Sequence, residues 1–561
     1  MKNGDKGKRT SCATKDNFRL LRLVAAISSG LLLSAAFPPL KLHWLAWVAF
    51  IPLLVVPTPR LWRRRIFVGF LFGYVHFCTA LHWLNEVGFG AGWLLAIVCA
   101  LFPMTWYILT SWWNWRLKEH DAASHAGAGL LYTVSDWRHA ASILAYTVFW
   151  VALEFIRGHI CTGFPWDLVG ISQFECTRIL KIVPYVGVYG VSFIIVLVNA
   201  ALASEFSRQL GHFIYSSKRG FPLYLVVLAV FLAPCVLVWL TPDSKTQENP
   251  KEIICMSIQG NLPQARFWTE EDFQKALTTY IQCTEKAVQE HPEAELVIWP
   301  ECAVPAELGY APYFEARLAM HAKVQRHFII GAIRTAGLPG GSEDDVAEFN
   351  SAFYIDKDGA PIEHYDKMYR VPFGEYTPFG DKLVWLKEMI GMGRDLTPGK
   401  NPVVFKLDNG ARLGVNICYE DVFPNASKEF TRRKANILMT LTNDSWYNES
   451  SGAEQHLAHA VFRAVENRRP FLRCGNNSHS CYITPDGRIT GIPVEPLNGS
   501  PFVRATPVFK IPIYDGWGET FFTRHGDFFG IAVLLASVLF LMHIIIMVML
   551  GHNGNLKAIN N

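Results

Sequence analysis

The chain has 561 residues, of which 51% are hydrophobic and only 18% are charged, with a mean hydropathy of +0.18. This balance excludes an intrinsically disordered chain and a collagen-like repeat, and the length favours more than one folding unit. The net charge of +4 and the 12 cysteines give no indication of nucleic-acid binding or of a disulfide-stabilised scaffold.

Apolar residues are concentrated in the first 241 residues and in one run near the C-terminus. A helix needs roughly 20 apolar residues to cross the hydrocarbon core of a bilayer. Eight apolar runs therefore predict about eight membrane spans, with buried core helices as the alternative for the short runs 23–40, 42–59 and 140–153. The other five runs are 66–85, 91–115, 183–203, 221–241 and 528–550.

The basic residues of the short loops predict how the chain is oriented in a membrane. If the N-terminus is cytoplasmic, the loops on its side hold 17 Lys and Arg residues and the opposite loops hold 4. Positive charge accumulates in cytoplasmic loops, so the long segment 242–527 is expected outside the cytoplasm, with 551–561 as a cytoplasmic tail. Residues 23–36 are also similar to the hydrophobic region of a signal peptide, but we expect them to remain as an uncleaved helix.

The long segment has a more ordinary composition, with short apolar runs between longer mixed stretches. Its apolar runs predict strands, the stretches 270–289, 313–326 and 453–467 show helical spacing, and the pairs Asp358-Gly359 and Asp486-Gly487 predict hairpin turns. Strands that alternate with helices indicate an α/β layered domain. We therefore expect a polytopic helical membrane domain over 1–241, an α/β domain over 242–527 and a last transmembrane helix over 528–550. The predicted strands are 253–258, 296–299, 328–333, 352–355, 413–418, 437–442 and 481–483.

Three reactive side chains lie at or near the ends of predicted strands. Glu301 follows the strand 296–299 and a proline, Cys418 ends the strand 413–418, and Lys367 lies in a loop rich in charges and turn residues. Strand ends are the usual place for a site in α/β sheets. A carboxylate that accepts a thiol proton, a thiolate that attacks a carbonyl and a cation that stabilises the oxyanion make a workable catalyst. Taken singly, each residue also has a structural explanation, as a helix-end charge, a buried thiol or a surface ammonium.

These residues lie in segments that resemble the Glu-Lys-Cys triad segments of the nitrilase superfamily: Trp299-Pro300-Glu301, Lys367 with 372–376, and Cys418-Tyr419-Glu420. More narrowly, the chain resembles the apolipoprotein N-acyltransferase family of bacterial integral membrane enzymes. The resemblance runs from about residue 20 to 530 and implies a nitrilase-like αββα sandwich outside the cytoplasm. Further segments similar to the family are 163–166, 260–264 with Trp268, 441–446, 455–456, 463–467 with 469–470, and 476–477.

The resemblance implies an N-acyltransferase of class EC 2.3.1 that works by a ping-pong mechanism through an acyl-enzyme. Glu301 is expected to act as general base on Cys418, which attacks an acyl ester of a membrane phospholipid while Lys367 holds the oxyanion. The thioester then acylates the α-amino group of the N-terminal diacylglyceryl-cysteine of an apolipoprotein. The implied location is the bacterial inner membrane, with the catalytic domain on the periplasmic side.

The family also implies supporting roles for Trp268, Glu375, Tyr419 and Glu420. We expect the two carboxylates to orient Lys367 and fix its charge, and the two aromatic side chains to line the lipid path. One departure is Cys302, which places a second thiol beside the base where the family often has Thr.

We expect no cofactor and no metal ion. His456 and His459 lie near Glu454, but their spacing differs from the His-Glu-x-x-His pattern of zinc proteases. The segment 391–393 lacks the third glycine of a dinucleotide-binding fingerprint. Any disulfide of the outer segment would involve its five cysteines other than Cys418, because a nucleophile must stay reduced.

Two other functions would use some of the same features. A membrane-tethered carbon–nitrogen hydrolase acting on a small polar amide would use the same triad, but eight spans exceed what an anchor needs. A transporter with an accessory domain would have ionisable residues inside several spans, whereas Glu154 and Arg157 lie near a helix end. The apolar stretch 383–392 is interpreted either as a core helix or as a flap that contacts lipid, and the flap would favour the acyltransferase.

Overall fold

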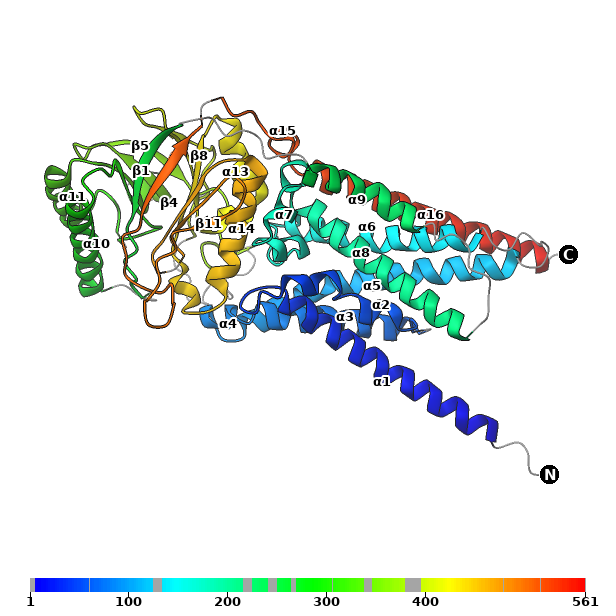
Figure 1. Cartoon of the computed structure of the whole chain (residues 1–561). Coiled ribbons are helices and arrows are strands. Elements are labelled where there is room, and N and C mark those ends of the chain that lie inside the picture. Colours follow the sequence, from blue (N-terminus) through cyan, green and yellow to red (C-terminus); the bar gives the residue numbers. More distant parts are fainter. Residues whose placement is uncertain are drawn as a thin grey trace. The chain divides into compact units, whose positions relative to one another are not determined.

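A computed structural model of the chain describes residues 6–59, 61–124, 134–214, 224–240, 250–263, 269–304, 306–337, 346–378, 395–477, 479–514 and 516–559 (Figure 1). Internal contacts divide the chain into two compact units. The first, which we call the helical unit, comprises Met1–Gln173, Val188–Thr241 and Asp527–Asn561. The second, which we call the sheet unit, comprises Pro242–Gly526 and the short segment Phe174–Gly187.

The helical unit is built mainly from long apolar helices. Its long helix α3 packs against α1 and α5, and α6 packs against α5 and α16. Its helices are α1 (Lys6–Ala35), η1 (His43–Trp47), α2 (Ile51–Val55), α3 (Trp62–Ala80), α4 (Leu84–Val87), α5 (Ala91–Ser124), α6 (Val134–His159), η2 (Val169–Gln173), α9 (Tyr224–Leu240), α16 (Phe528–Ile559) and most of α8 (Val183–Ile214).

Four helical stretches in the described part of the chain are long and apolar enough to cross a membrane: Ala91–Asn114, Ala140–His159, Val183–Ser207 and Phe528–Ile546. Two shorter apolar helices cover His43–Val55 and Val227–Leu240. The expected helical region with several apolar helices is therefore confirmed. The number of eight spans stays a prediction.

Small residues and buried aromatic rings hold the helical unit together. A Cβ atom at Gly69 of α3 would lie 2.8 Å from Tyr107, and one at Gly73 would lie 2.9 Å from Pro103, both on α5. Glycine at these positions therefore lets the two helices approach closely, as small residues do between membrane helices. Edge-on and tilted ring contacts join the cluster Phe50, Phe72, Trp106 and Trp150.

The sheet unit contains two six-stranded sheets. The first has the order β12-β1-β2-β3-β4-β5, and the second has the order β11-β10-β9-β8-β7-β6. In each sheet three neighbouring strands are parallel: β1, β2 and β3 in the first, and β7, β8 and β9 in the second. The strands are β1 (Lys251–Ser257), β2 (Leu296–Trp299), β3 (His327–Gly337), β4 (Val346–Ile355), β5 (Pro361–Asp366), β6 (Val404–Lys406), β7 (Arg412–Ile417), β8 (Ile437–Thr442), β9 (Phe471–Gly475), β10 (Cys481–Ile483), β11 (Ile489–Thr490) and β12 (Val508–Ile513).

Helices cover the outer faces of the two sheets. Figure 1 shows α10 (Glu270–Glu290) and α11 (Ala311–Val324) on one side, and α13 (Pro424–Arg432) and α14 (Gly452–Asn467) on the other. The inner faces meet, since the Cys474 thiol of β9 donates to the Ile298 carbonyl of β2 at 3.4 Å. The expected α/β layered domain is therefore confirmed. Its shorter helices are α7 (Thr177–Leu180), η3 (Cys418–Val422), η4 (Asp444–Tyr447) and α15 (Phe521–His525).

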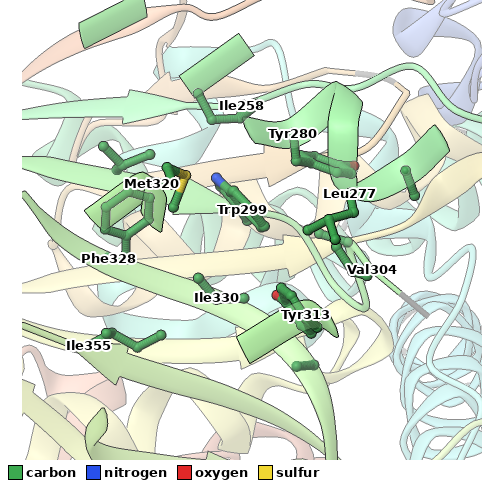
Figure 2. Packing of buried hydrophobic residues seen from close by; sticks show 14 of the residues in the cluster. Ile258, Leu277, Tyr280, Trp299, Val304, Tyr313, Met320, Phe328, Ile330 and Ile355 are labelled. Carbon is green, nitrogen blue, oxygen red and sulfur yellow. The ribbon is translucent and has the colours of Figure 1, made fainter. Parts of the chain in front are cut away.

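The core of the first sheet lies between its strands and α10 and α11 (Figure 2). Trp299 of β2 is fully buried, packs against the Tyr280 ring at 5.2 Å and donates its indole N–H to Thr284 at 3.0 Å. Phe328 of β3 meets the edge of the Trp299 ring at 6.3 Å. Because Trp299 is held by contacts on several sides, the position of the end of β2 and of the residues that follow it is fixed by packing.

Candidate active site

Glu301 lies just beyond the end of β2, where the chain turns sharply. Its side chain is 7% exposed, and Cys302 next to it has a positive φ of 42°. The turn packs on Gly331 of the neighbouring strand β3, where a Cβ atom would lie 2.7 Å from the Glu301 Cα. Glycine at 331 is thus required for the close approach that places this carboxylate at the sheet edge.

Lys367 is the first residue after β5, and its ammonium lies between two carboxylates. Its Nζ is 2.8 Å from Glu375 Oε1 and 3.2 Å from Glu301 Oε1, and the side chain is 2% exposed. Burial alone would lower the pKa of Lys367, but Glu375 and Glu301 outweigh it and raise the pKa well above its usual value. The group is therefore a permanent cation. An ammonium has three donors, so one remains for a developing oxyanion.

Two asparagines hold the carboxylates in place. The side-chain amide of Asn350 on β4 donates to Glu301 Oε1 at 2.8 Å and to Glu375 Oε1 at 3.0 Å. The backbone N–H of Asn443, just after β8, donates to Glu301 Oε2 at 3.1 Å. The other oxygen of Glu375 accepts the N–H of Val371 at 2.8 Å across a tight turn. We call Glu301, Lys367, Glu375 and Asn350 the triad cluster. The cluster contains two of the three triad residues, and Cys418 is not counted in it.

Cys418 begins η3 directly after β7, and it differs here from the expectation that it ends a strand. The strand stops at Ile417, and Cys418 has a φ of 50°, a left-handed conformation that is strained for a residue with a Cβ atom. The residue is 6% exposed. Burial and the charge of Glu301 raise the pKa of the thiol well above its usual range, although Lys367 acts in the opposite direction. Cys418 thus rests as a thiol and needs a base to become a nucleophile.

Glu420 is completely buried and joins the lysine loop to the cysteine strand. Its Oε1 accepts the backbone N–H groups of Met368 at 2.6 Å and Tyr369 at 3.1 Å, and its Oε2 accepts that of Ile417 at 2.8 Å. The Tyr365 hydroxyl donates to the same carboxylate at 2.8 Å. Glu375 contacts Lys367 directly, as expected. Glu420 instead accepts backbone N–H groups from the loop that carries Lys367 and from the strand that precedes Cys418.

The aromatic residues expected on the lipid path are placed only in part. Tyr419 is buried and meets the Phe423 ring edge-on at 5.0 Å, and Phe423 stacks on Tyr369 at 4.7 Å. Trp268 and the expected flap 383–392 lie outside the described residues. The six cysteines of the long segment 242–527 are all free.

A small cavity of about 10 Å³, which is room for about one water molecule, opens beside the base. Glu301, Cys302 and Asn443 contribute to its wall, so a group that enters it comes next to the carboxylate. The remaining lining residues are Leu262, Pro263, Tyr280, Ala303 and Asn476.

Sequence reasoning missed several residues that hold the site. Asn350 gave no signal, because it lies inside a strand and belongs to no motif. Asn443 and Asp444 lie in a segment noted only as similar to the family. His456 lies in the segment 455–456, which was noted as similar to the family, and was otherwise considered as a metal ligand; Arg473 of β9 was not considered. The structure places Asp421, Asp444, His456 and Arg473 together behind Cys418.

Comparisons with known proteins cover both units. A family model described as apolipoprotein N-acyltransferase N-terminal domain matches residues 29–201, and one described as carbon-nitrogen hydrolase matches residues 257–495. A protein named apolipoprotein N-acyltransferase from Geobacter metallireducens is 28% identical over 520 residues, which are 91% of this chain and 93% of that protein. A protein of the same name from Rickettsia typhi is 26% identical over 84% of this chain and 88% of its own length.

Solved structures match part of the chain at lower similarity. The crystal structure of Saccharomyces cerevisiae Nit3, a member of branch 10 of the nitrilase superfamily, is 18% identical, with a TM-score of 0.34. The match covers 46% of this chain and 90% of that one.

Proposed function

We propose that this chain, which belongs to the apolipoprotein N-acyltransferase family, moves an acyl chain from a membrane phospholipid to an apolipoprotein through a thioester on Cys418. The acceptor is the α-amino group of the N-terminal diacylglyceryl-cysteine. The observation that carries the proposal is the buried Lys367 ammonium between Glu301 and Glu375. This ammonium also interacts electrostatically with Cys418, each group affecting the pKa of the other. The chain also has membrane-length helices, which bring such a site to a lipid substrate.

In the first step the thiol is acylated. Glu301 takes the proton of Cys418, and the sulfur forms a bond to the ester carbonyl carbon of the phospholipid. The negative charge that develops on the carbonyl oxygen is stabilised by the remaining N–H of Lys367. The C–O bond then breaks, the lysophospholipid oxygen takes the proton from Glu301, and a thioester remains.

In the second step the acceptor amine attacks the thioester carbonyl. An α-amino group has a pKa of about 7.7–8.0, so a useful fraction is neutral and nucleophilic near neutral pH. The C–N bond forms, the C–S bond breaks, and Glu301 transfers the amine proton to the sulfur of Cys418. A thioester is more reactive to amines than the starting ester, which gives the two-step route its advantage.

Supporting residues act on this chemistry at different distances. Glu375 orients Lys367, and Glu420 holds the loop and the strand that carry Lys367 and Cys418. Tyr419 and Trp268 line the path of the acyl chain.

The proposed location is the bacterial inner membrane, with the catalytic site on the periplasmic side. The excess of basic residues in the loops on the side of the N-terminus supports this orientation. The proposed domains are a membrane domain of seven spans over 1–241, a catalytic domain over 242–527, an eighth span over 528–550 and a cytoplasmic tail over 551–561.

A transfer assay tests the proposal. The purified full-length chain is reconstituted in vesicles of phospholipid with labelled acyl chains and given a short lipopeptide with an N-terminal diacylglyceryl-cysteine. We expect the label to reach the α-amine as an amide, and a lipopeptide with an acetylated amine to stay unlabelled.

Matched cysteine variants assign the nucleophile in the same assay. Cys418→Ala is expected to abolish transfer, and Cys283→Ala, which removes a half-buried thiol of α10, is expected to preserve it. If simple amides are hydrolysed and no label reaches the lipopeptide, the chain is a hydrolase and the proposal is wrong. If Cys302→Ala abolishes transfer and Cys418→Ala does not, the nucleophile is wrongly assigned.

A further inference from the structure

Four charged side chains lie fully buried behind the Cys418 turn, on four different elements. Asp421 belongs to η3, Asp444 to η4, His456 to α14 and Arg473 to β9, and each is 0% exposed. Arg473 bridges the two acids, with Nη2 at 2.6 Å from Asp444 Oδ2 and Nη1 at 3.3 Å from Asp421 Oδ2. We call these four residues the His456 network.

His456 faces a carboxylate with each of its ring nitrogens. Nε2 is 2.8 Å from Asp421 Oδ1, and Nδ1 is 3.0 Å from Asp444 Oδ1. A neutral imidazole has only one N–H, whereas Nδ1 faces the Asp444 carboxylate and Nε2 faces the Asp421 carboxylate and the Cys418 carbonyl. These acceptors favour the doubly protonated ring, against the Arg473 guanidinium, whose Nη2 lies 3.1 Å from Nδ1. Burial works against this charge, but Asp421 and Asp444 outweigh burial and the repulsion of Arg473, raising the pKa of His456 to about 9. The network then holds two positive and two negative charges.

The network touches the backbone of the nucleophile. Nε2 of His456 also donates to the carbonyl oxygen of Cys418 at 3.3 Å. On the N-terminal side of Cys418, Glu420 accepts the backbone N–H of the preceding residue, Ile417, at 2.8 Å. The strained φ of 50° at Cys418 therefore lies between two buried anchors, one on each side.

A further contact joins the network to the thiol itself. The Thr442 hydroxyl donates to Asp444 at 3.0 Å and is also hydrogen-bonded to the Cys418 side chain. Asp444 raises the pKa of the Cys418 thiol, as Glu301 does. The positive charges of His456 and Arg473 offset the effect of Asp444, so loss of either would leave uncompensated negative charge near the sulfur.

We infer that His456 is a positioning residue for Cys418: its imidazolium holds the carbonyl of the strained turn so that the thiol faces Glu301 and Lys367. The inference rests on the proposed role of Cys418 as the acylated residue. It adds a residue that touches neither substrate nor sulfur and acts through the backbone of the nucleophile.

Two substitutions separate positioning from general support of the fold. His456→Gln places an amide N–H near the position of Nε2, and so preserves a donor to the Cys418 carbonyl. His456→Asn places it near Nδ1, and so preserves only the contact with Asp444. Both variants lose the charge, and the Asn side chain is one methylene group shorter than that of Gln. His459→Gln, three residues further along α14 and also buried, is the control for loss of a buried imidazole.

The experiment measures single-turnover acylation of Cys418 in the purified full-length chain, with p-nitrophenyl butyrate as the acyl donor. We expect His456→Asn to be about tenfold slower than His456→Gln, because one hydrogen bond separates them. His459→Gln is expected to acylate at the wild-type rate.

A second measurement follows alkylation of Cys418 by iodoacetamide from pH 6 to 10, resolved by mass spectrometry of the Cys418 peptide. We expect both His456 variants to shift the alkylation profile to higher pH by similar amounts, since both remove the same positive charge. Equal acylation by the two variants, or an unshifted profile, would overturn the inference. Acylation by the activated ester without any acylation by phospholipid would overturn the proposed function and leave the inference standing.

Discussion

Two buried ionic clusters flank Cys418, and they differ in charge balance. The triad cluster has two carboxylates and one ammonium, so it holds a surplus negative charge. The His456 network has two carboxylates, a guanidinium and an imidazolium, so its charges cancel. A cluster with surplus negative charge can accept a proton, whereas a balanced one resists change in protonation. We therefore propose that the triad cluster performs the chemistry and that the His456 network maintains geometry.

The largest effect is expected from Lys367→Met, which keeps the length of the side chain and removes its charge. Glu301 and Glu375 then remain buried together without a cation, so one of them takes up a proton. The oxyanion also loses its donor. We expect single-turnover acylation of Cys418 to fall about a hundredfold to a thousandfold.

Lys323→Met is the matched control, because it removes an exposed ammonium that pairs with Glu285 of α10. It is expected to leave the acylation rate unchanged. An acylation rate of Lys367→Met close to that of the wild type would mean that surplus negative charge is not what makes the triad cluster reactive.

Glu375→Gln makes the triad cluster balanced, like the His456 network. Lys367 then pairs with Glu301 alone and holds its negative charge more firmly, so the carboxylate accepts the thiol proton less readily. We expect acylation to slow about tenfold, while the Gln oxygen still accepts the N–H of Val371. Rates measured from pH 6 to 9 check this. If Glu375→Gln is acylated as fast as the wild type, the difference in charge between the two clusters does not determine reactivity.

Gly331→Ala perturbs the backbone under Glu301 without touching a charge. The new Cβ atom would lie 2.7 Å from Glu301 Cα and 2.9 Å from the Cys302 nitrogen, so the turn must shift. We expect a loss of stability on the order of 1–3 kcal/mol and severalfold slower acylation. Gly337→Ala on the same strand is the control, since no atom of the described residues lies within 4 Å of its added Cβ atom. Equal behaviour of the two variants in thermal unfolding and acylation would contradict the packing argument.

The His456 network is also expected to make the stability of the chain depend on pH. The pKa of His456 is about 9 in the folded chain and about 6.5 when unfolded. Its contribution is therefore complete below pH 6.5 and lost as the pH rises through 9, with a size on the order of 3 kcal/mol. Thermal unfolding in detergent at pH 6 and pH 9.5 measures it. His456→Gln is expected to be less stable at pH 6 and to lose less on going to pH 9.5; a loss equal to that of the wild type would contradict the assignment of charge.

The parts of the fold that could be predicted from sequence are those set by local pattern. The helices expected at 270–289 and 453–467 match α10 and α14, and the Asp358-Gly359 turn joins β4 to β5 with Gly359 at φ 89°. Strands without an apolar run escaped prediction. β5, with the sequence Pro-Ile-Glu-His-Tyr-Asp, is mostly exposed at the sheet edge, and β12 pairs with β1 across more than 200 residues of chain.

The functional site also contains residues that could be predicted from local sequence pattern and residues that could not. Glu301, Lys367, Glu375 and Cys418 lie in short motifs, and these could be read from the sequence. Asn350 lies inside β4 and Arg473 lies inside β9, where one polar residue among mostly apolar neighbours is indistinguishable from a satisfied core residue. The left-handed turn at Cys418 was also missed, because a strand-like run gives no sign of the residue at which it stops.

The central claim is that Cys418 carries the acyl chain and that Glu301 accepts its proton. The most direct measurement is the mass of the Cys418 peptide after the full-length chain is incubated with phospholipid vesicles. The account predicts an added acyl chain on this peptide in the wild type, removed by hydroxylamine, and no added mass in Glu301→Gln within the same time. An acyl chain on another cysteine, or equal acylation in Glu301→Gln, would contradict it.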